Sequence, residues 1–212
     1  SLLMTTVLLI RHAVNDYVKT GKLAGWTPGV HLNEEGIAQS EALGACLADV
    51  PLKVLYTSPL ERAVETAAAV QKHHPHLSLN VLEGVKEVDF GEWQGMSLGD
   101  LRKRKLWEVV QHYPSRAVFP QGESFPEAQF RAVQAVERIV KAHPAQLVAV
   151  FSHSDIIKLI LAHYLGMHLD TFQRIEISTA SISTVQLGHA SPYVVGLNDV
   201  AHLRQLKRET KS

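Results

Sequence analysis

The stretch Val7-Leu8-Leu9-Ile10-Arg11-His12-Ala13 decides how the chain folds. Its four consecutive apolar residues predict a short strand that is buried on both faces of a sheet. The run ends at a cation and an imidazole, and open parallel sheets bind ligands beyond the carboxyl ends of their strands. Arginine offers a fork of donors for phosphate or carboxylate oxygens, and neutral histidine offers a nitrogen lone pair. The pair Arg11-His12 is therefore compatible with a nucleophile beside an anion-binding group. On the dipeptide alone, however, an ion-paired arginine and a capping histidine are the simpler interpretation, and only the rest of the chain changes this.

The composition fits one α/β domain and argues against several other classes of protein. Of the 212 residues 46% are hydrophobic, which is ample for a core, and 21 Lys and Arg balance 21 Asp and Glu. A net charge near zero argues against a dedicated nucleic-acid binder, and no apolar run approaches the roughly 20 residues of a membrane helix. We therefore expect neither a nucleic acid nor a membrane as partner, and the oligomeric state stays open.

The chain has one cysteine, Cys46, which excludes an internal disulfide and favours a reducing compartment. The first residues, Ser1-Leu2-Leu3-Met4, do not resemble a signal peptide, so we expect a cytoplasmic protein. Cys46 flanks an apolar stripe of Ile37, Leu43 and Leu47 at helical spacing. We therefore expect Cys46 to lie in the core rather than to act as a nucleophile.

Short apolar runs alternate with helical patterns along the rest of the chain, which favours a mainly parallel sheet covered on both faces. Beyond the first strand, the predicted strands are Lys53–Tyr56, Leu79–Leu82, Leu147–Phe151, Ser181–Leu187 and Tyr193–Leu197. The predicted helices follow Asn33 and Pro59 and span Leu98–Tyr113, Phe125 or Glu127 to His143, and Ile156–Leu165. We predict an α/β fold, a three-layer α/β/α sandwich of one domain over residues 1–212, with a small insertion at about 84–126 over the carboxyl edge of the sheet.

Three predicted strands end at residues that can bind an anion. The first ends at Arg11 and His12, and the strongest, Leu147–Phe151, is followed by His153. Arg62 falls in the first turn of a helix for which Ser58 is the expected cap, where free backbone amides also favour anions. Because the carboxyl ends of parallel strands share one edge of the sheet, these side chains point to one ligand.

These residues and their surroundings resemble the histidine phosphatase superfamily, also called the phosphoglycerate-mutase-like family. The matching motifs, in the order of the family, are Leu9-Ile10-Arg11-His12-Ala13, Gly25-Trp26, Leu32-Asn33-Glu34-Glu35-Gly36, Ser58-Pro59-Leu60-Glu61-Arg62-Ala63, Glu87-Val88-Asp89-Phe90-Gly91, Gly122-Glu123-Ser124, Ser152-His153 and Leu197-Asn198-Asp199. Each motif is weak alone, but together they run through almost the whole chain.

The resemblance implies a role for five residues. His12 is the expected nucleophile that accepts the phosphoryl group, and Arg11, Arg62 and His153 are expected to bind the phosphoryl oxygens together with it. Glu87 is the expected proton donor to the leaving oxygen. Fixed cations stabilise the charge that spreads over the oxygens of a transferring phosphoryl group, so we expect neither a metal nor a cofactor.

Two positions depart from the pattern of the family. Ala13 stands where glycine usually follows the nucleophile, and this needs a backbone angle that alanine tolerates. Val18 stands where many members have an asparagine, and its side chain cannot bind phosphate. Asn15 or the Gly25 amide is a candidate to replace that contact.

Other polar residues allow two interpretations each. Glu123 and Ser124 are candidate substrate contacts, although Ser124 is as well suited to cap a helix. The group His73, His74 and His76 resembles a metal cluster, but its position around Pro75 fits a turn better. We therefore expect no metal site.

Three functions are compatible with these features. The first is a phosphomonoester hydrolase that forms a phosphohistidine on a small phosphorylated metabolite. The second is a 2,3-bisphosphoglycerate-dependent phosphoglycerate mutase, and the third is a non-catalytic binding module. The insertion is short and lacks paired arginines, and the ending Leu197–Leu203 resembles the phosphatase branch of the family. The presence of all five residues with an expected catalytic role argues against a non-catalytic module. The physiological substrate stays open.

Overall fold

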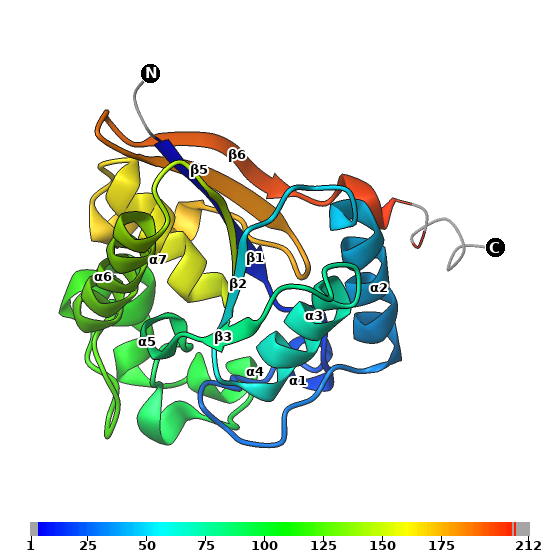
Figure 1. The fold of residues 1–212 in the computed structure, drawn as a ribbon. Helices are drawn as coiled ribbons and strands as arrows, with labels where there is room; N and C mark the ends of the chain where they lie inside the picture. The colour runs from blue at the N-terminus through cyan, green and yellow to red at the C-terminus, as the bar shows by residue number, and fades with distance from the viewer. Residues whose placement is uncertain (1–3, 205, 207–212) are drawn as a thin grey trace.

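The computed structural model describes residues 4–204 and 206. The residues Ser1–Leu3, on which the prediction about a signal peptide partly rests, lie outside the described residues. The chain forms one six-stranded sheet with helices around it (Figure 1). Its strands are β1 (Met4–Arg11), β2 (Val54–Thr57), β3 (Leu79–Val81), β4 (Leu147–Ser152), β5 (Ile182–Gly188) and β6 (Tyr193–Asp199).

The sheet is mostly parallel, as predicted, and its order is β3-β2-β4-β1-β5-β6. The strands β1 to β4 pair in parallel, whereas β5 pairs antiparallel with β1 and β6 pairs antiparallel with β5. The first strand therefore lies inside the sheet, between β4 and β5. Burial on both faces explains why its sequence is a continuous apolar run rather than an alternation.

Alternate residues of β1 pack on opposite faces of the sheet. Four helices cover the sheet: α2 (Glu34–Leu47), α3 (Glu61–Gln71), α6 (Phe125–Ala142) and α7 (Ser154–Tyr164). Val7 and Leu9 belong to the core under α6 and α7, whereas Leu8 and Ile10 belong to the core under α2 and α3. Figure 1 shows these two helix pairs on opposite sides of the sheet, which confirms the predicted three layers.

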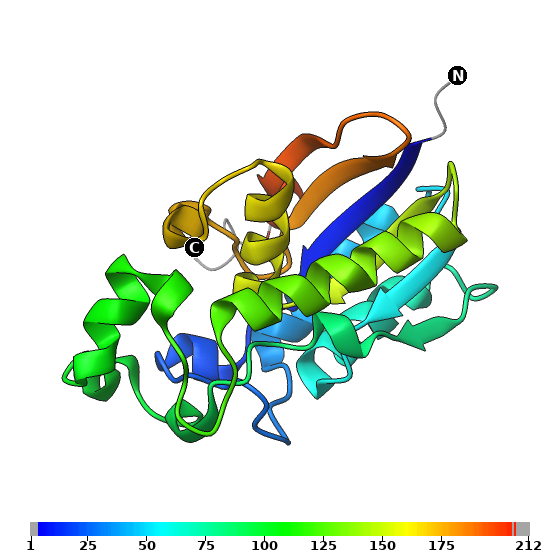
Figure 2. The ribbon, with the colours of Figure 1, turned by 90° about the vertical axis from the view of Figure 1, so that its left-hand side faces the viewer.

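The segment between β3 and α6, for which the sequence predicts an insertion, contains short elements. The predicted helix Leu98–Tyr113 is broken by a turn at residues 102–104 into α4 (Leu98–Leu101) and α5 (Lys105–His112). Figure 2 shows these green helices beyond the end of the sheet toward which β1 runs. The remaining short elements are α1 (Asp16–Lys19) and 3₁₀ turns at Glu83–Val85, Gly91–Trp93, Pro114–Arg116, Leu169–Arg174 and Ala201–Leu203.

The buried face of α2 differs from the expected one. Cys46 is exposed and Ile37 is 51% exposed, so the prediction that Cys46 lies in the core is wrong. The buried face instead combines Leu43 and Leu47 with small residues, among them Gly44. A Cβ on Gly44 would lie 2.7 Å from the carbonyl oxygen of Ala69, so glycine lets α2 approach α3 closely. No helix in the described part of the chain is both long and apolar enough to cross a membrane.

Candidate active site

The register of the parallel strands brings the two site histidines together. Arg11 at the end of β1 pairs with Ser152 at the end of β4, and the residue that follows each strand is a histidine. The backbone N–H of His12 donates to the carbonyl of Ser152 over 2.9 Å. The rings of His12 and His153 therefore lie side by side, with their centroids 5.3 Å apart.

His12 is held as a neutral imidazole with one free nitrogen lone pair. Its Nδ1 lies 2.7 Å from the carbonyl oxygen of Ala13, and since a carbonyl only accepts, Nδ1 carries the proton. Nε2 then keeps its lone pair. Burial and the nearby charges of Arg62 and Arg11 hold the pKa of His12 well below its usual value. His12 therefore has the tautomer and charge that a nucleophile needs near neutral pH.

Ala13 fits its position without backbone strain. The described non-glycine residues with a positive φ are Gln121, Ala145, Ala180 and Asn198, so Ala13 has an ordinary backbone angle. The residue is fully buried, and its N–H donates to Oγ1 of Thr66 over 3.0 Å. Replacing the glycine usual in the family by alanine thus leaves the adjacent His12 in place.

Two arginines approach His12 from different segments. Arg62 is the second residue of α3 and is 1% exposed, and its Nη2 donates to the carbonyl of Gly25 over 2.8 Å. The φ of Gly25 is +51°, a conformation that favours glycine, and a Cβ there would meet the side chain of Gln94 at 2.5 Å. Arg11 donates from Nη1 to the carbonyl of Ile177 over 2.7 Å. Each guanidinium is therefore fixed at one end by a backbone carbonyl.

Three other nitrogens of these two arginines, Nε of Arg11 and both Nε and Nη1 of Arg62, are buried and have no hydrogen-bond partner. Within the described residues, six buried side-chain polar atoms lack a hydrogen-bond partner, and all but Oγ of Ser181 are nitrogens. Four are obligate donors: Nε of Arg11, Nδ2 of Asn15, and Nε and Nη1 of Arg62. Unpaired buried donors cost stability, and in a native protein a cluster of them indicates a ligand that accepts hydrogen bonds. Their number and positive charge indicate an anion.

One cavity of about 140 Å³ is lined by these donors and by two acids. Its walls include Arg11, His12, Asn15, Arg62, Glu87 and Asp155. Asn15 caps α1 with Oδ1, which leaves Nδ2 as the free buried donor, while Val18 is 38% exposed at the rim. Asn15 therefore has the geometry to supply the contact that Val18 cannot.

Glu87 is a buried acid beside the histidines. Its Oε1 accepts from the N–H of Val88 over 2.9 Å, and its Oε2 lies 4.0 Å from Nδ1 of His153. Burial first, and then the negative charge of Asp155, raise the pKa of Glu87 to about 7, although Arg62 and Arg11 oppose this rise. A carboxyl with this pKa is about half protonated at neutral pH and mostly protonated below it, so it can act as a proton donor there.

Ser58 has a different role from the expected helix cap. Helix α3 begins at Glu61, and its N-terminal cap position is Leu60, which makes no side-chain cap. Oγ of Ser58 instead lies 2.7 Å from Nε2 of His153 and accepts the N–H of Leu60 over 3.3 Å. Ser58 thus fixes the ring of His153, because the end of β2 lies beside the end of β4.

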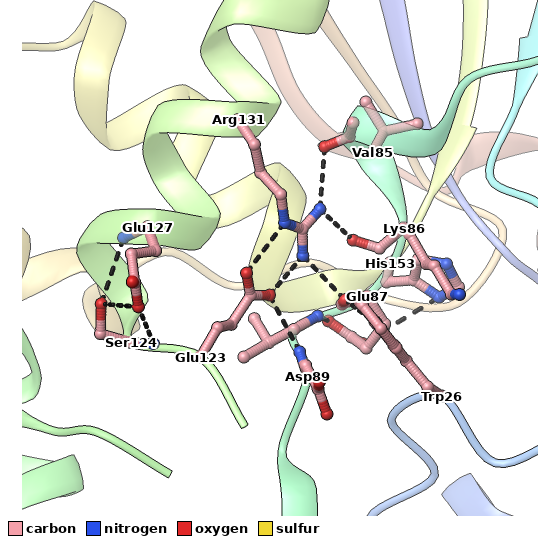
Figure 3. Close-up of polar contacts among 12 residues, drawn as sticks. Trp26, Val85, Lys86, Glu87, Asp89, Glu123, Ser124, Glu127, Arg131 and His153 are labelled. Atoms are coloured by element: carbon pink, nitrogen blue, oxygen red, sulfur yellow. Dashed lines mark hydrogen bonds and ion pairs between the residues drawn. The ribbon is translucent and has the colours of Figure 1, made fainter. Parts of the chain in front are cut away.

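Glu123 and Ser124, the predicted substrate contacts, are not among the described residues that line the cavity. Ser124 caps α6 in a reciprocal capping box with Glu127 (Figure 3). Glu123 forms an ion pair with Arg131 and accepts the N–H of Asp89 over 2.9 Å. Arg131 and Asp155 are not among the site residues predicted from the sequence. Only the position of Asp155, two residues after His153, could have indicated a place in the cavity.

A second, aromatic cavity of about 110 Å³ adjoins the first. The two share the walls Leu23, Phe90 and Asp155. Its other walls include Trp93 and Trp107, whose rings are stacked with centroids 6.4 Å apart. An apolar group of a bound molecule can therefore lie beside the anion site.

Comparison with known proteins agrees with this geometry. The sequence model of the histidine phosphatase superfamily (branch 1) matches residues 7–200. The chain belongs to the histidine phosphatase superfamily. The match includes β1 from Val7 onward, all of β4 and every residue placed around the cavity.

This histidine phosphatase is similar to proteins from several bacteria. It is 27% identical over 205 residues to phosphoserine phosphatase 1 of Hydrogenobacter thermophilus, covering 94% of this chain and 95% of that protein. It is 27% identical over 200 residues to the uncharacterized phosphatase PhoE of Bacillus subtilis, covering 94% and 97%. The solved structure of Bacillus stearothermophilus YhfR superposes with a TM-score of 0.89 at 26% identity, covering 94% of this chain and 100% of YhfR.

Proposed function

We propose that the protein hydrolyses phosphomonoesters of small metabolites through a phosphohistidine on His12. The observation that carries this proposal is the set of buried, unpaired donors around the free Nε2 of His12. The printed names of the relatives, a phosphoserine phosphatase and a phosphatase, support the same class of reaction. The aromatic cavity supports substrates whose carbon skeleton extends away from the phosphate.

The first step transfers the phosphoryl group to the enzyme. Nε2 of His12 attacks phosphorus as the ester P–O bond breaks, and Glu87 gives its proton to the departing oxygen. Arg11 and Arg62, with donors already fixed by the fold, stabilise the charge on the phosphoryl oxygens. His153, held by Ser58, binds the same group from the neighbouring strand end.

The second step returns the enzyme to its starting state. The carboxylate of Glu87 accepts a proton from a water molecule, whose oxygen attacks the phosphorus. The P–N bond to His12 breaks, and inorganic phosphate leaves. Glu87 thus acts as an acid in one step and as a base in the other, which a pKa of about 7 permits.

A phosphoglycerate mutase is the alternative, because it passes the phosphoryl group to an acceptor hydroxyl instead of water. Measuring phosphate release from a panel of phosphorylated metabolites, with and without 2,3-bisphosphoglycerate, separates the two activities. We expect release without this activator, and we expect no interconversion of phosphoglycerates. An isomerised product formed only with the activator would support the mutase.

The pH dependence tests the role of Glu87. Because the donor must be protonated, the rate of phosphorylation by an alkyl phosphate is expected to fall as pH rises above about 7, by about tenfold per unit well above the pKa. The Asp155→Asn variant removes a charge that raises this pKa, so its profile is expected to fall at lower pH. Rapid-mixing measurements of the phosphorylation step provide both profiles. A wild-type rate that is constant from pH 6 to 9 would contradict the assignment.

Metal removal is expected to leave activity unchanged. The described residues contain no group of three or more His, Cys, Asp or Glu side chains that could hold a metal, and Nε2 of His74 instead lies 2.8 Å from the carbonyl of Leu47. Phosphate release is measured before and after dialysis against EDTA, with a zinc-dependent phosphatase as the positive control. Loss of activity that a divalent ion restores would contradict the proposal.

The expected setting is a reducing compartment such as the cytoplasm. This proposal rests on the single cysteine, Cys46, whose thiol is free.

A further inference from the structure

Arg131, on α6, donates three of its five N–H groups to the backbone segment that carries Glu87 and the other two to the carboxylate of Glu123. Its Nη1 donates to the carbonyls of Gly84 and Lys86 over 2.9 and 2.8 Å. Its Nη2 donates to the carbonyl of Glu87 over 2.8 Å and to Oε1 of Glu123 over 2.5 Å. Its Nε donates to Oε2 of Glu123 over 3.0 Å. Figure 3 shows the guanidinium at the centre of these contacts.

These contacts hold the backbone on both sides of the acid. Gly84 lies in the 3₁₀ turn Glu83–Val85, and Lys86 and Glu87 lie in the loop that follows, where the described residues form no regular helix or strand hydrogen bonds. Oε1 of Glu123, paired with Arg131, also accepts the N–H of Asp89 over 2.9 Å. The ion pair of Arg131 and Glu123 therefore fixes the backbone between residues 84 and 89 by hydrogen bonds.

We propose that Arg131 is a positioning residue that fixes the carboxyl of Glu87 against the leaving oxygen. This proposal rests on the proposed function, in which Glu87 is the proton donor. Arg131 is not among the described residues that line the cavity of His12, so it acts through the Glu87 backbone. Its charge is paired with that of Glu123, so we expect its effect on Glu87 to come from the geometry of the backbone.

The chemistry of arginine explains why lysine cannot replace it. A guanidinium is a planar fork with five donors, whereas an ammonium has three donors at one point. Lysine at position 131 can therefore hold some of the acceptors but cannot span Glu123 and three carbonyls at once. The loop is then free to move by a fraction of an ångström, and proton transfer depends steeply on such displacements.

The test compares two leaving groups in the Arg131→Lys variant. Phosphorylation by an alkyl phosphate needs the proton of Glu87 and is expected to slow by roughly 10- to 100-fold. Phosphorylation by p-nitrophenyl phosphate hardly needs it and is expected to change less than about threefold. The matched control is Arg138→Lys, an exposed position on the same helix, for which no change is expected. Equal loss on both substrates, or no loss on either, would overturn the proposal.

A second variant carries the test if Arg131→Lys does not fold. Both oxygens of Glu123 accept hydrogen bonds, from Arg131 and Asp89. Glu123→Gln replaces one oxygen by an NH₂ group, so in either orientation a donor faces a donor. We expect Glu123→Gln to slow phosphorylation by alkyl phosphates selectively, as Arg131→Lys does. In the Glu87→Gln background no proton donor remains to be positioned, so we expect Glu123→Gln to cause no further slowing there. Additive losses in the two backgrounds would contradict a role through Glu87.

The same experiments distinguish failure of this proposal from failure of the proposed function. If wild-type enzyme is phosphorylated on His12 by p-nitrophenyl phosphate but the Arg131 and Glu123 variants show no substrate selectivity, the positioning role alone is wrong. If wild-type enzyme forms no phosphohistidine at all, the proposed mechanism is wrong.

Discussion

The His12→Ala variant is expected to lose phosphatase activity by at least about 10³-fold while keeping its fold, because it removes the nucleophile of a covalent mechanism. His12 is 3% exposed, and its Nδ1 bonds the carbonyl of the adjacent Ala13, so the substitution removes a local contact rather than a link between elements. Phosphate release and thermal unfolding measured on the same preparation separate loss of chemistry from loss of structure.

The control for this prediction is His163→Ala, which removes an exposed histidine of α7 and is expected to leave the rate unchanged. Substantial turnover in His12→Ala would remove the covalent mechanism. Loss of cooperative unfolding would mean that His12 is needed by the fold, and His12→Gln, closer in size, would then be compared.

The Glu87→Gln variant is expected to slow alkyl phosphates more than p-nitrophenyl phosphate by a differential of roughly 10²-fold, given the usual size of general acid catalysis. An alkyl oxygen leaves only when protonated, whereas nitrophenolate leaves well without a proton. Glutamine keeps the shape of Glu87 and an acceptor for the N–H of Val88, so the loop is expected to stay in place. Measuring formation of the phosphoenzyme avoids any effect on its later hydrolysis.

Asp89 is the matched control for Glu87. Its Oδ1 accepts the N–H of Gly91 over 3.0 Å, and Asp89 is not among the described residues of the cavity walls. Asp89→Asn is therefore expected to lack the differential between substrates. If Asp89→Asn shows the differential and Glu87→Gln does not, the acid is Asp89. If Glu87→Gln slows both substrates equally, Glu87 binds phosphate or supports the loop.

The sheet and the convergence of its strand ends could be predicted from local sequence. Strands buried on both faces are unbroken apolar runs, and in this chain two of those runs end directly at Arg11 and at Ser152-His153. Parallel pairing then places such ends at one edge, and the observed register does bring His12 beside His153. The assignment of their roles came from the family resemblance.

The rest could not be predicted because it depends on contacts without a local signal. The buried face of α2 depends on small residues such as Gly44, which hydrophobic periodicity ignores, so Cys46 was assigned to the wrong side. The backbone carbonyls that Arg131 binds, those of Gly84, Lys86 and Glu87, come 44 to 47 positions before it in the chain. Nothing in the spacing of α6 distinguishes Arg131 from Arg138, the other arginine of that helix. Asn15 has a free Nδ2 group because its Oδ1 caps the short helix α1, and the sequence around Asn15 does not show how its side chain is used.

The most direct test of the central claim is to trap the phosphoenzyme. Wild-type protein is mixed with p-nitrophenyl phosphate, quenched in base, digested, and analysed by mass spectrometry for the peptide that contains His12. The mechanism predicts a phosphoryl group on His12 that is stable in base and lost in acid, and no such group in His12→Ala. Turnover without any phosphorylated His12, or an acid-stable phosphoryl group on another residue, would contradict it.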